Sequence, residues 1–389
     1  MTPRQLVLNA GSATVKFGLY GETGVTLRGL VERIAEAPRL RLLEGNLATR
    51  DFQAPPGGPA DAAEALLDWL AANGLLDDLH GIGHRVVHGG TDHAAPVAID
   101  DDVLASLTRL EPLAPLHQPP ALAIIRRLRE RYPALPQVAC FDTAFHRTQP
   151  RLHQLFALPH RFADQGILRY GFHGLSYAHV ARRLAEVIGA ERAAGRVVIA
   201  HLGQGCSLCA LKGGRSLATS MGFTALDGMM MGSRCGSLDP GVVLHLQRQL
   251  GMDVEAVEQL LYRESGLLGV SGLSSDMRDL LASDRPRAVE AVALFIERLL
   301  QEIGALVATL GGLDALVFTA GIGEHAAPIR ARTAERLDWL GVTLDEAANR
   351  RHARRIDAGR GPALAVIPTD EEAEIAAATR ACLQASSRR

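Results

Sequence analysis

Apolar residues change their spacing from one segment of the chain to the next, and these changes outline alternating strands and helices. Short apolar runs, typical of buried strands, occur at 81–88, 137–141 and 313–319. Apolar residues at helical spacing predict helices over 62–72, 120–132, 177–188 and 289–310. The Pro- and Gly-rich stretch 54–59 predicts a surface loop. An alternation of this kind is typical of the α/β class.

Two segments share one outline: an apolar run, a turn of small residues and a second apolar run. They span 6–20 and 197–211, and each is typical of a β-hairpin whose turn gathers backbone N–H groups. A shift of 192 positions superposes Asn9 on His201 and Gly11 on Gly203. A repeat of about half the chain favours a duplicated domain, although any strand–turn–strand segment has this outline. In a duplicated protein, the two turns would face a cleft between two lobes that closes on the substrates.

The composition fits a folded protein of two or three domains. Of 389 residues, 47% are hydrophobic and 22% are charged, which provides enough apolar material for large cores. The net charge of -2 lacks the basic surplus expected of a nucleic-acid-binding protein. The most apolar stretch, 291–318, is interrupted by charged residues, and the first residues lack a signal-peptide core. We therefore expect a cytoplasmic protein with no membrane or nucleic-acid partner.

Polar or charged residues follow several of the apolar runs, at the positions where α/β proteins bind their ligands. Each of them alone has a structural explanation, such as an ordinary turn or a buried histidine, but their joint occurrence indicates a site. These residues are Asn9 with Lys16, Arg85 with His88, Asp142, His201 with Gln204, and Glu324.

The types of these residues indicate phosphate chemistry. Glycine-containing turns at 11–12, 203–205 and 321–323 could offer backbone N–H groups to phosphate oxygens. Arg85 and Arg234 could each bind a planar oxyanion through two N–H groups. Asn9 and the acidic pair 371–372 offer the hard oxygen ligands that Mg²⁺ prefers. The sequence contains neither a P-loop nor a protein-kinase glycine loop, so neither of those phosphoryl-transfer folds is indicated.

Taken together, these motifs resemble the acetate kinase family, which includes acetate, propionate and butyrate kinases. The matching stretches are 9–16, 83–90, 114–117, 141–146, 170–174, 201–205, 220–224, 231–234, 318–324 and 368–372. The resemblance implies the duplicated actin-like, Hsp70-like and sugar-kinase fold, with two lobes that each hold a ribonuclease-H-like sheet flanked by helices. It implies an N-terminal lobe for the acyl group and Mg²⁺, formed by residues 1–147 and 372–389. It also implies a C-terminal lobe for the nucleotide and for dimerisation, formed by residues 148–371.

The activity that the resemblance implies is reversible phosphorylation of acetate or propionate, with ATP or ADP as co-substrate, in a homodimer. The implied catalytic residues are Asp142, Arg234, His173 and Arg85. The implied substrate-binding residues are Arg85, Val87, Leu116, His117, Phe172 and Ala225. The nucleotide would be bound by Lys16, His201, Leu202, Gly203, Gln204, Gly205, Asp276, Met277, Arg278, Gly321, Ile322, Gly323, Glu324 and His325. The implied ligands of Mg²⁺, or of Mn²⁺ in its place, are Asn9 and Glu371.

Simple electrostatics agrees with these implied roles. A metaphosphate-like transition state spreads charge over three oxygens, which Arg85, Arg234 and His173 could stabilise together with Mg²⁺. Asp142 would orient either the acyl carboxylate or the metal, because a carboxylate nucleophile needs no general base. We expect Arg234→Ala and Asp142→Ala to abolish turnover and to leave the fold intact.

Several positions depart from the pattern of the family, and they keep two alternatives open. One is a drifted paralogue that uses a bulkier acid or another phosphate donor. The other is a nucleotide-binding module without catalysis. The retained catalytic residues argue against this second alternative. The departures include Gln204 and His325 in place of asparagine, Ala225 in place of proline, Asp227 in place of glutamate, Ser237 in place of aspartate, and Tyr177 in place of histidine.

Overall fold

The computed structural model describes residues 4–11, 14–45, 47–49, 51–115 and 117–386. The chain divides into two compact units, unit 1 (Met1–Phe145 and Asp370–Arg389) and unit 2 (His146–Thr369). The sequence-based lobe boundaries fell at 147 and 371, so Glu371, expected in the C-terminal lobe, lies in unit 1 instead. Among the described helices, none is both long enough and apolar enough to cross a membrane.

Unit 1 contains a seven-stranded sheet in the order β4-β3-β2-β1-β5-β7-β6. Strands β1, β5 and β7 run parallel, whereas β2, β3 and β4 continue from β1 as an antiparallel meander. The strands are β1 (Arg4–Ala10), β2 (Thr14–Gly21), β3 (Gly24–Glu32), β4 (Arg39–Glu44), β5 (Leu79–Val86), β6 (Val97–Ala98) and β7 (Gln137–Phe141). The helices are α1 (Pro59–Ala72), α2 (Asp101–Thr108), α3 (Gln118–Arg131) and α16 (Glu371–Ser386).

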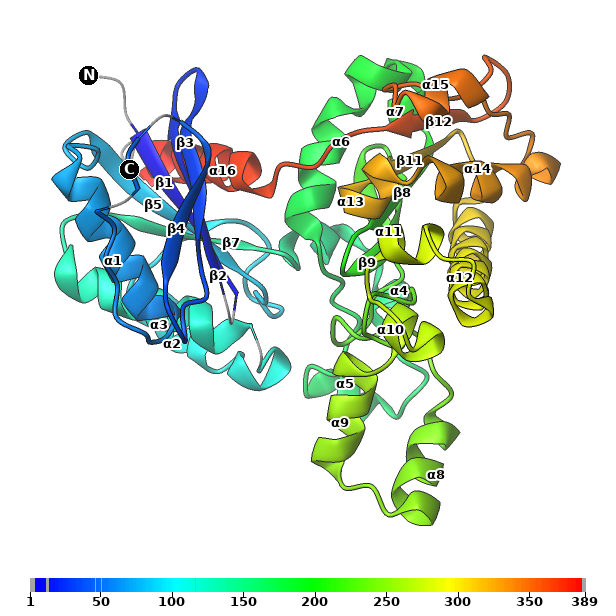
Figure 1. The fold of residues 1–389 in the computed structure, drawn as a ribbon, viewed down its shortest axis with the longest axis horizontal. Helices are drawn as coiled ribbons and strands as arrows, with labels where there is room; N and C mark the ends of the chain where they lie inside the picture. Colours follow the sequence, from blue (N-terminus) through cyan, green and yellow to red (C-terminus); the bar gives the residue numbers. More distant parts are fainter. Residues whose placement is uncertain (1–3, 12–13, 46, 50, 116, 387–389) are drawn as a thin grey trace. The chain divides into compact units, whose positions relative to one another are not determined.

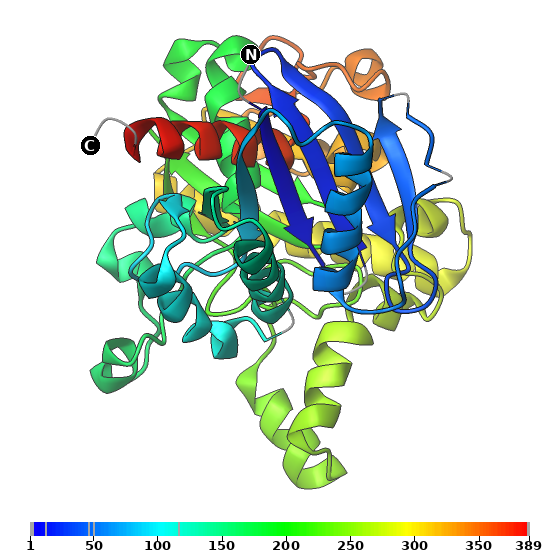
Figure 2. The same ribbon diagram turned by 90° about the vertical axis from the view of Figure 1, so that its left-hand side faces the viewer.

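Helices cover both faces of this sheet, as the residues of β5 show. Ile82 belongs to one buried cluster with Leu66 of α1 and Leu128 of α3. Because side chains alternate along a strand, its neighbours point to the opposite face. A Cβ at Gly83 would collide with Thr379 of α16, which places α16 on that opposite face. Figure 2 shows α1 lying across the strands of the sheet.

Unit 2 contains a five-stranded sheet in the order β10-β9-β8-β11-β12. The helix α12 packs on β8, β9 and β10, and α6 packs on β8 and β12 (Figure 1). The strands are β8 (Arg196–Leu202), β9 (Cys206–Lys212), β10 (Arg215–Thr219), β11 (Ala315–Thr319) and β12 (Ala363–Val366). The helices are α4 (Arg151–Gln154), α5 (His160–Asp164), α6 (Gly174–Ile188), α7 (Ala190–Ala193), α8 (Pro240–Leu250), α9 (Val254–Arg263), α10 (Gly266–Ser271), α11 (Met277–Leu281), α12 (Pro286–Leu310), α13 (Ala320–His325), α14 (Ala327–Glu335) and α15 (Glu346–Arg350).

The two sheets confirm the predicted duplication. Strand β8 starts 192 residues after β1, and β9 starts 192 residues after β2. In both sheets the first strand pairs antiparallel with the second, and it pairs parallel with the strand that follows the antiparallel meander, which is β5 in unit 1 and β11 in unit 2. The units also exchange a helix, since α6 follows β7 along the chain but packs in unit 2, while α16 follows β12 and packs in unit 1.

Most of the predicted elements are present, with boundaries that differ by a few residues. The strand predicted over 137–141 has these bounds in the structure, and the predicted helices begin two or three residues earlier than expected. Pro59, expected in a loop, is the first residue of α1, where its missing N–H costs no hydrogen bond. β5 ends at Val86 rather than at His88 because the chain turns there, with Gly90 N donating to His88 Nδ1 over 2.9 Å.

Candidate active site

Two residues at the ends of parallel strands in unit 1 form a partly buried ion pair. Arg85 lies near the end of β5, opposite Cys140 in the register of β7, and Asp142 follows directly after β7. Arg85 Nε and Nη2 donate to the two carboxylate oxygens of Asp142 over 3.0 and 2.6 Å. Asp142 is only 1% exposed. The sequence predicted that Arg85 binds a planar oxyanion through two N–H groups. In the structure, Nε and Nη2 of Arg85 already donate to Asp142, so this edge of the guanidinium is occupied.

Two further oxygen-bearing side chains lie at the same guanidinium. Asn9, near the end of β1, accepts a hydrogen bond from Arg85 Nη1 over 3.3 Å. Glu371, the first residue of α16, places its Oε2 at 3.8 Å from Arg85 Nε. We call Asn9, Arg85, Asp142 and Glu371 the Arg85 cluster. It brings together Asn9 and Glu371, the implied metal ligands, with Arg85 and Asp142, two of the implied catalytic residues.

The charges of the Arg85 cluster depend on one another. Burial disfavours the charge of Arg85, but Asp142 and Glu371 outweigh this effect and raise its pKa. Burial also raises the pKa of Glu371. The negative charges of Asp142 and Glu372 raise it further, whereas the positive charges of Arg85 and Lys16 lower it, and the net shift is upward. Two carboxylates and an amide form a hard oxygen donor set of the kind that Mg²⁺ binds. The residues therefore fit a divalent cation, which would favour the ionised form of Glu371.

The other sequence-predicted residues of unit 1 lie on elements next to this cluster. Lys16 is exposed on β2 and is paired with Asn9 in the strand register. Val87 is buried directly after β5, and His117 precedes α3 as its N-cap residue. Leu116 and Ser12 lie outside the described residues.

In unit 2, two predicted histidines stack on each other. His173 precedes α6 with a φ of 58° in the left-handed region, and its ring lies 4.2 Å from the ring of His201 at an interplanar angle of 16°. His173 Nδ1 lies 2.8 Å from Ser207 Oγ, and His201 Nδ1 lies 2.8 Å from Ser176 Oγ. Hydroxyl groups therefore fix the orientation of both imidazoles.

Arg234 and His173 both approach the glycine turn that joins β8 to β9. A Cβ at Gly205 would lie 3.2 Å from His173 Nε2 and 3.8 Å from Arg234 Nη1. Gly203 N donates to Gly205 O over 3.1 Å, which closes the turn, and Arg234 Nη1 donates to Ala225 O over 3.0 Å. Unit 2 thus places an imidazole and a guanidinium beside one glycine-rich turn.

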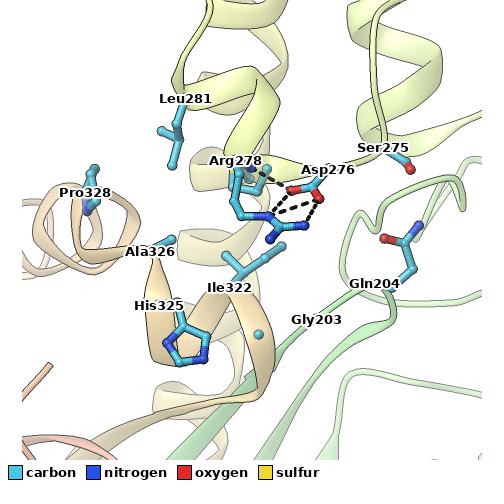
Figure 3. A pocket seen from close by; sticks show the side chains of 12 residues that line it. Gly203, Gln204, Ser275, Asp276, Arg278, Leu281, Ile322, His325, Ala326 and Pro328 are labelled. Carbon is cyan, nitrogen blue, oxygen red and sulfur yellow. Dashed lines mark hydrogen bonds and ion pairs between the residues drawn. The ribbon is translucent and has the colours of Figure 1, made fainter. Parts of the chain in front are cut away.

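A pocket of about 390 Å³ opens beside the same turn (Figure 3). On one wall Arg278 forms an ion pair with Asp276, with Nη2 and Oδ2 2.5 Å apart. Ile322 and His325 project from α13, and the wall is predominantly apolar. The lining residues are Gly203, Gln204, Ser275, Asp276, Met277, Arg278, Leu281, Gly321, Ile322, His325, Ala326 and Pro328.

Eight of the predicted nucleotide residues line this pocket, and several others do not. The predicted turn at 321–323 is part of α13 rather than an open loop. Glu324 caps this helix, since its Oε1 accepts from the backbone N–H groups of Ala320 and Thr369 over 2.8 and 3.1 Å. The lining residues that sequence reasoning missed are Ser275, Leu281, Ala326 and Pro328; apart from their position beside the predicted motifs, no signal marks them. The predicted residues of unit 2 that do not line the pocket are His201, Leu202, Gly205, Gly323 and Glu324.

Comparisons with known proteins agree on one family. Residues 4–377 match the acetokinase family. An acetate kinase of Rhodopseudomonas palustris is 52% identical, with 95% of this chain and 96% of the relative covered. A propionate kinase of Citrobacter rodentium is 44% identical, with 97% and 96% covered. Among solved structures, a propionate kinase from Francisella tularensis superposes with a TM-score of 0.91 at 37% identity over 97% of this chain and 99% of that one. The acetate kinase of Porphyromonas gingivalis gives 0.89 at 34% identity over 98% and 100%.

Proposed function

Because the chain belongs to the acetokinase family, we propose that it is an ATP-dependent carboxylate kinase. It transfers the terminal phosphoryl group of ATP to a short carboxylate, reversibly, and yields an acyl phosphate and ADP. Acetate and propionate are the proposed acceptors, in line with the names of the relatives.

The pocket beside Gly203 is the observation that carries this proposal. Its apolar wall, with Ile322 and Leu281, suits the base and ribose of a nucleotide, and the glycine turn lies at the same pocket. Pyrophosphate has no apolar group that could contact this wall. The pocket therefore supports ATP over the alternative of a smaller phosphate donor.

In unit 2, Arg234 and His173 are the proposed contacts of the transferring phosphoryl group. Both lie beside Gly205, where the missing side chain allows His173 Nε2 and Arg234 Nη1 to approach the turn closely. Their N–H groups would meet the charge that develops on the phosphoryl oxygens in the transition state. The acyl group would contact Phe172 and Ala225 of this unit.

In unit 1, the Arg85 cluster is the proposed site for the carboxylate and Mg²⁺. Asn9 and Glu371 would hold the ion, which when bound neutralises charge on the phosphate oxygens. Asp142 orients Arg85 through its two hydrogen bonds, and the remaining N–H groups of Arg85 are the proposed contacts of the carboxylate. Val87, Leu116 and His117 are the proposed acyl neighbours.

We also propose that a second copy of the chain covers the arm, which we define as α8 and α9. None of the described side chains of α8 is buried, and Leu244, Leu250 and Val254 are 49, 63 and 64% exposed. Apolar surface of this kind is typical of a subunit interface. A cytoplasmic location, where ATP is available, completes the proposal.

The purified protein tests the proposed activity through hydroxylamine trapping of the acyl phosphate. Acetate, propionate and butyrate are each combined with ATP, GTP or pyrophosphate, with Mg²⁺ or with a chelator. We expect hydroxamate from ATP with acetate and propionate, and none after chelation. Product with pyrophosphate alone would favour the drifted paralogue, and no product with any acid would favour the non-catalytic module.

A further inference from the structure

A short chain of hydrogen bonds runs from the interior of unit 2 to His173. His173 and Tyr177 lie one helical turn apart at the start of α6, where Tyr177 N donates to His173 O over 3.0 Å. Both side chains therefore lie on the same side of the helix. Both also reach Ser207 of β9, whose Oγ lies 2.8 Å from His173 Nδ1 and 2.5 Å from the Tyr177 hydroxyl. Tyr177 and Ser207 are completely buried.

We propose that Tyr177 and Ser207 are positioning residues that keep His173 in the neutral tautomer with its proton on Nε2. An uncharged ring then presents an N–H group to the transferring phosphoryl group. This inference rests on the proposed function, because it assigns a direction to the hydrogen bonds that orient His173, one of the proposed contacts of the phosphoryl group.

The direction follows from the donor properties of the two hydroxyls. A phenol is a stronger donor than acceptor, because its ring delocalises the oxygen lone pair. Burial raises the pKa of Tyr177 well above its usual range, so the phenol keeps its proton at any pH at which the protein works. When Tyr177 donates to Ser207, the single proton of Ser207 is directed to His173 Nδ1. Nδ1 must then be the acceptor, and the ring proton of neutral His173 lies on Nε2.

The surroundings of the ring favour the same state. Nε2 is the ring atom nearest to the Cβ position of Gly205, the position that Arg234 Nη1 also approaches. A lone pair on Nε2 would repel phosphoryl oxygens there, whereas an N–H group attracts them. The stacked ring of His201 adds a second reason, because two imidazolium rings at 4.2 Å would repel each other.

The phenol at position 177 is one of the departures from the family pattern, which usually has histidine there. A histidine can donate or accept at either ring nitrogen, so it does not impose one direction on Ser207. A buried phenol carries one proton that it does not lose. The substitution therefore gives this chain a more strictly defined tautomer at His173.

Nitrogen-15 spectra of the full-length protein with labelled histidine test the tautomer directly. The signals of His173 are those that disappear in His173→Gln. We expect a protonated Nε2 and an unprotonated Nδ1 in the wild type. Tyr177→Phe and Ser207→Ala should give a mixture of tautomers, whereas Ser207→Thr, which keeps the hydroxyl, should retain the wild-type pattern. A wild-type ring protonated on Nδ1 or on both nitrogens would overturn the proposal.

Kinetics provide the second measurement. Tyr177→Phe and Ser207→Ala should each lower kcat about tenfold, as expected for one hydrogen bond, with little change in the KM for ATP. The double variant should lose little more than either single one, because both interrupt the same chain. An unchanged kcat in Tyr177→Phe with an unchanged tautomer would also overturn the proposal. The spectra do not depend on turnover, so a wild type without kinase activity would contradict the proposed function and leave the tautomer measurable.

Discussion

The five strands β3-β2-β1-β5-β7 of unit 1 have the same order as the five strands of unit 2, but the turns at the ends of these strands hold different chemistry. In unit 1, Asn9 lies within a cluster of full charges centred on Arg85. His201, the equivalent of Asn9 after the shift of 192 residues, lies within a network of hydroxyls and imidazoles. The duplicated backbone thus provides two similar frames, and the side chains fill one with paired charges and the other with hydroxyls and imidazoles.

Burial explains why the two networks differ in character. A buried charge requires a partner, so Asp142 at 1% exposure is stable only with Arg85 beside it. Hydroxyls such as those of Ser207 and Tyr177 need only hydrogen bonds and can be buried completely. Unit 1 should therefore respond to the loss of a single charge more strongly than unit 2 responds to the loss of a single hydroxyl.

Replacement of Asp142 should have the largest effect and would test this contrast most severely. Asp142→Asn should lower kcat by about 10²–10⁴, because Arg85 loses its charged orienting partner. The sequence led us to expect an intact fold after Asp142→Ala, but the burial of Asp142 changes that expectation. Of its ion pairs with described residues, Arg85 would then keep only the longer one with Glu371, at 3.8 Å, and the loss of Asp142 should cost up to about 3–5 kcal/mol of unfolding free energy. Steady-state kinetics and urea unfolding measure the two effects, and wild-type stability in Asp142→Ala would refute the ionic description of unit 1.

An acidic pair in unit 2 provides a second test, through pH. Glu302 of α12 is half-buried, and burial together with the charge of Asp227 raises its pKa from 4.5 to about 7, against the effects of Arg169 and Arg298. The folded state therefore holds this proton more tightly than the unfolded state does. The resulting stability is complete below pH 4.5 and is lost as the pH rises through about 7.

Glu302→Gln should remove this pH dependence. Relative to the variant, the wild type should lose at most about 3 kcal/mol of unfolding free energy across that window, and less if water screens the carboxyl. Urea unfolding at a series of pH values measures the difference. Parallel curves for the two proteins would show that the fold of unit 2 does not raise the pKa of Glu302.

These contrasts also explain what the sequence could predict. The hairpins and their repeat were predictable because a glycine turn between two apolar runs is a local signal. Arg85 and Asp142 were predictable because each lies next to the end of an apolar strand. The link between Tyr177 and Ser207 was not, since these residues lie 30 positions apart and no motif joins them. The exchange of α6 and α16 and the apolar wall of the pocket beside Gly203 likewise depend on tertiary packing, which spacing does not encode.

The size of the accepted acid tests the part of unit 2 that we assign to the acyl group. Ala225 lacks the ring of the proline that is usual in the family, so we expect propionate to be used at least as well as acetate. Ala225→Pro should shift the ratio of kcat/KM toward acetate by about tenfold, roughly the effect of one methylene. The Ala225 carbonyl accepts from Arg234, and proline retains that acceptor. A ratio unchanged by the proline would show that position 225 does not determine the acid.

The smallest expected effect concerns Ser237, where the family usually has aspartate. Its Oγ donates to Asp227 Oδ1 over 2.9 Å and accepts from Gly228 N over 3.1 Å. Ser237→Asp would keep the acceptor but would place a second carboxylate against Asp227, whose ion pair with Arg169 spans 3.2 Å. Because Ser237 is exposed, this repulsion should cost only about 0.5–1 kcal/mol of unfolding free energy at neutral pH.

Ser237→Asn is the matched control, because its amide can still donate to Asp227 while it leaves the charge unchanged. Only the aspartate variant should lose stability, and the loss should shrink at high salt or below the pKa of the added acid. We expect no gain in kcat from the aspartate, since Asp227 is already adapted to a neutral neighbour in this chain. A more stable or faster Ser237→Asp protein would mean that unit 2 can accommodate an ionic cluster as unit 1 does, and that the contrast between the two units reflects drift rather than a physical requirement.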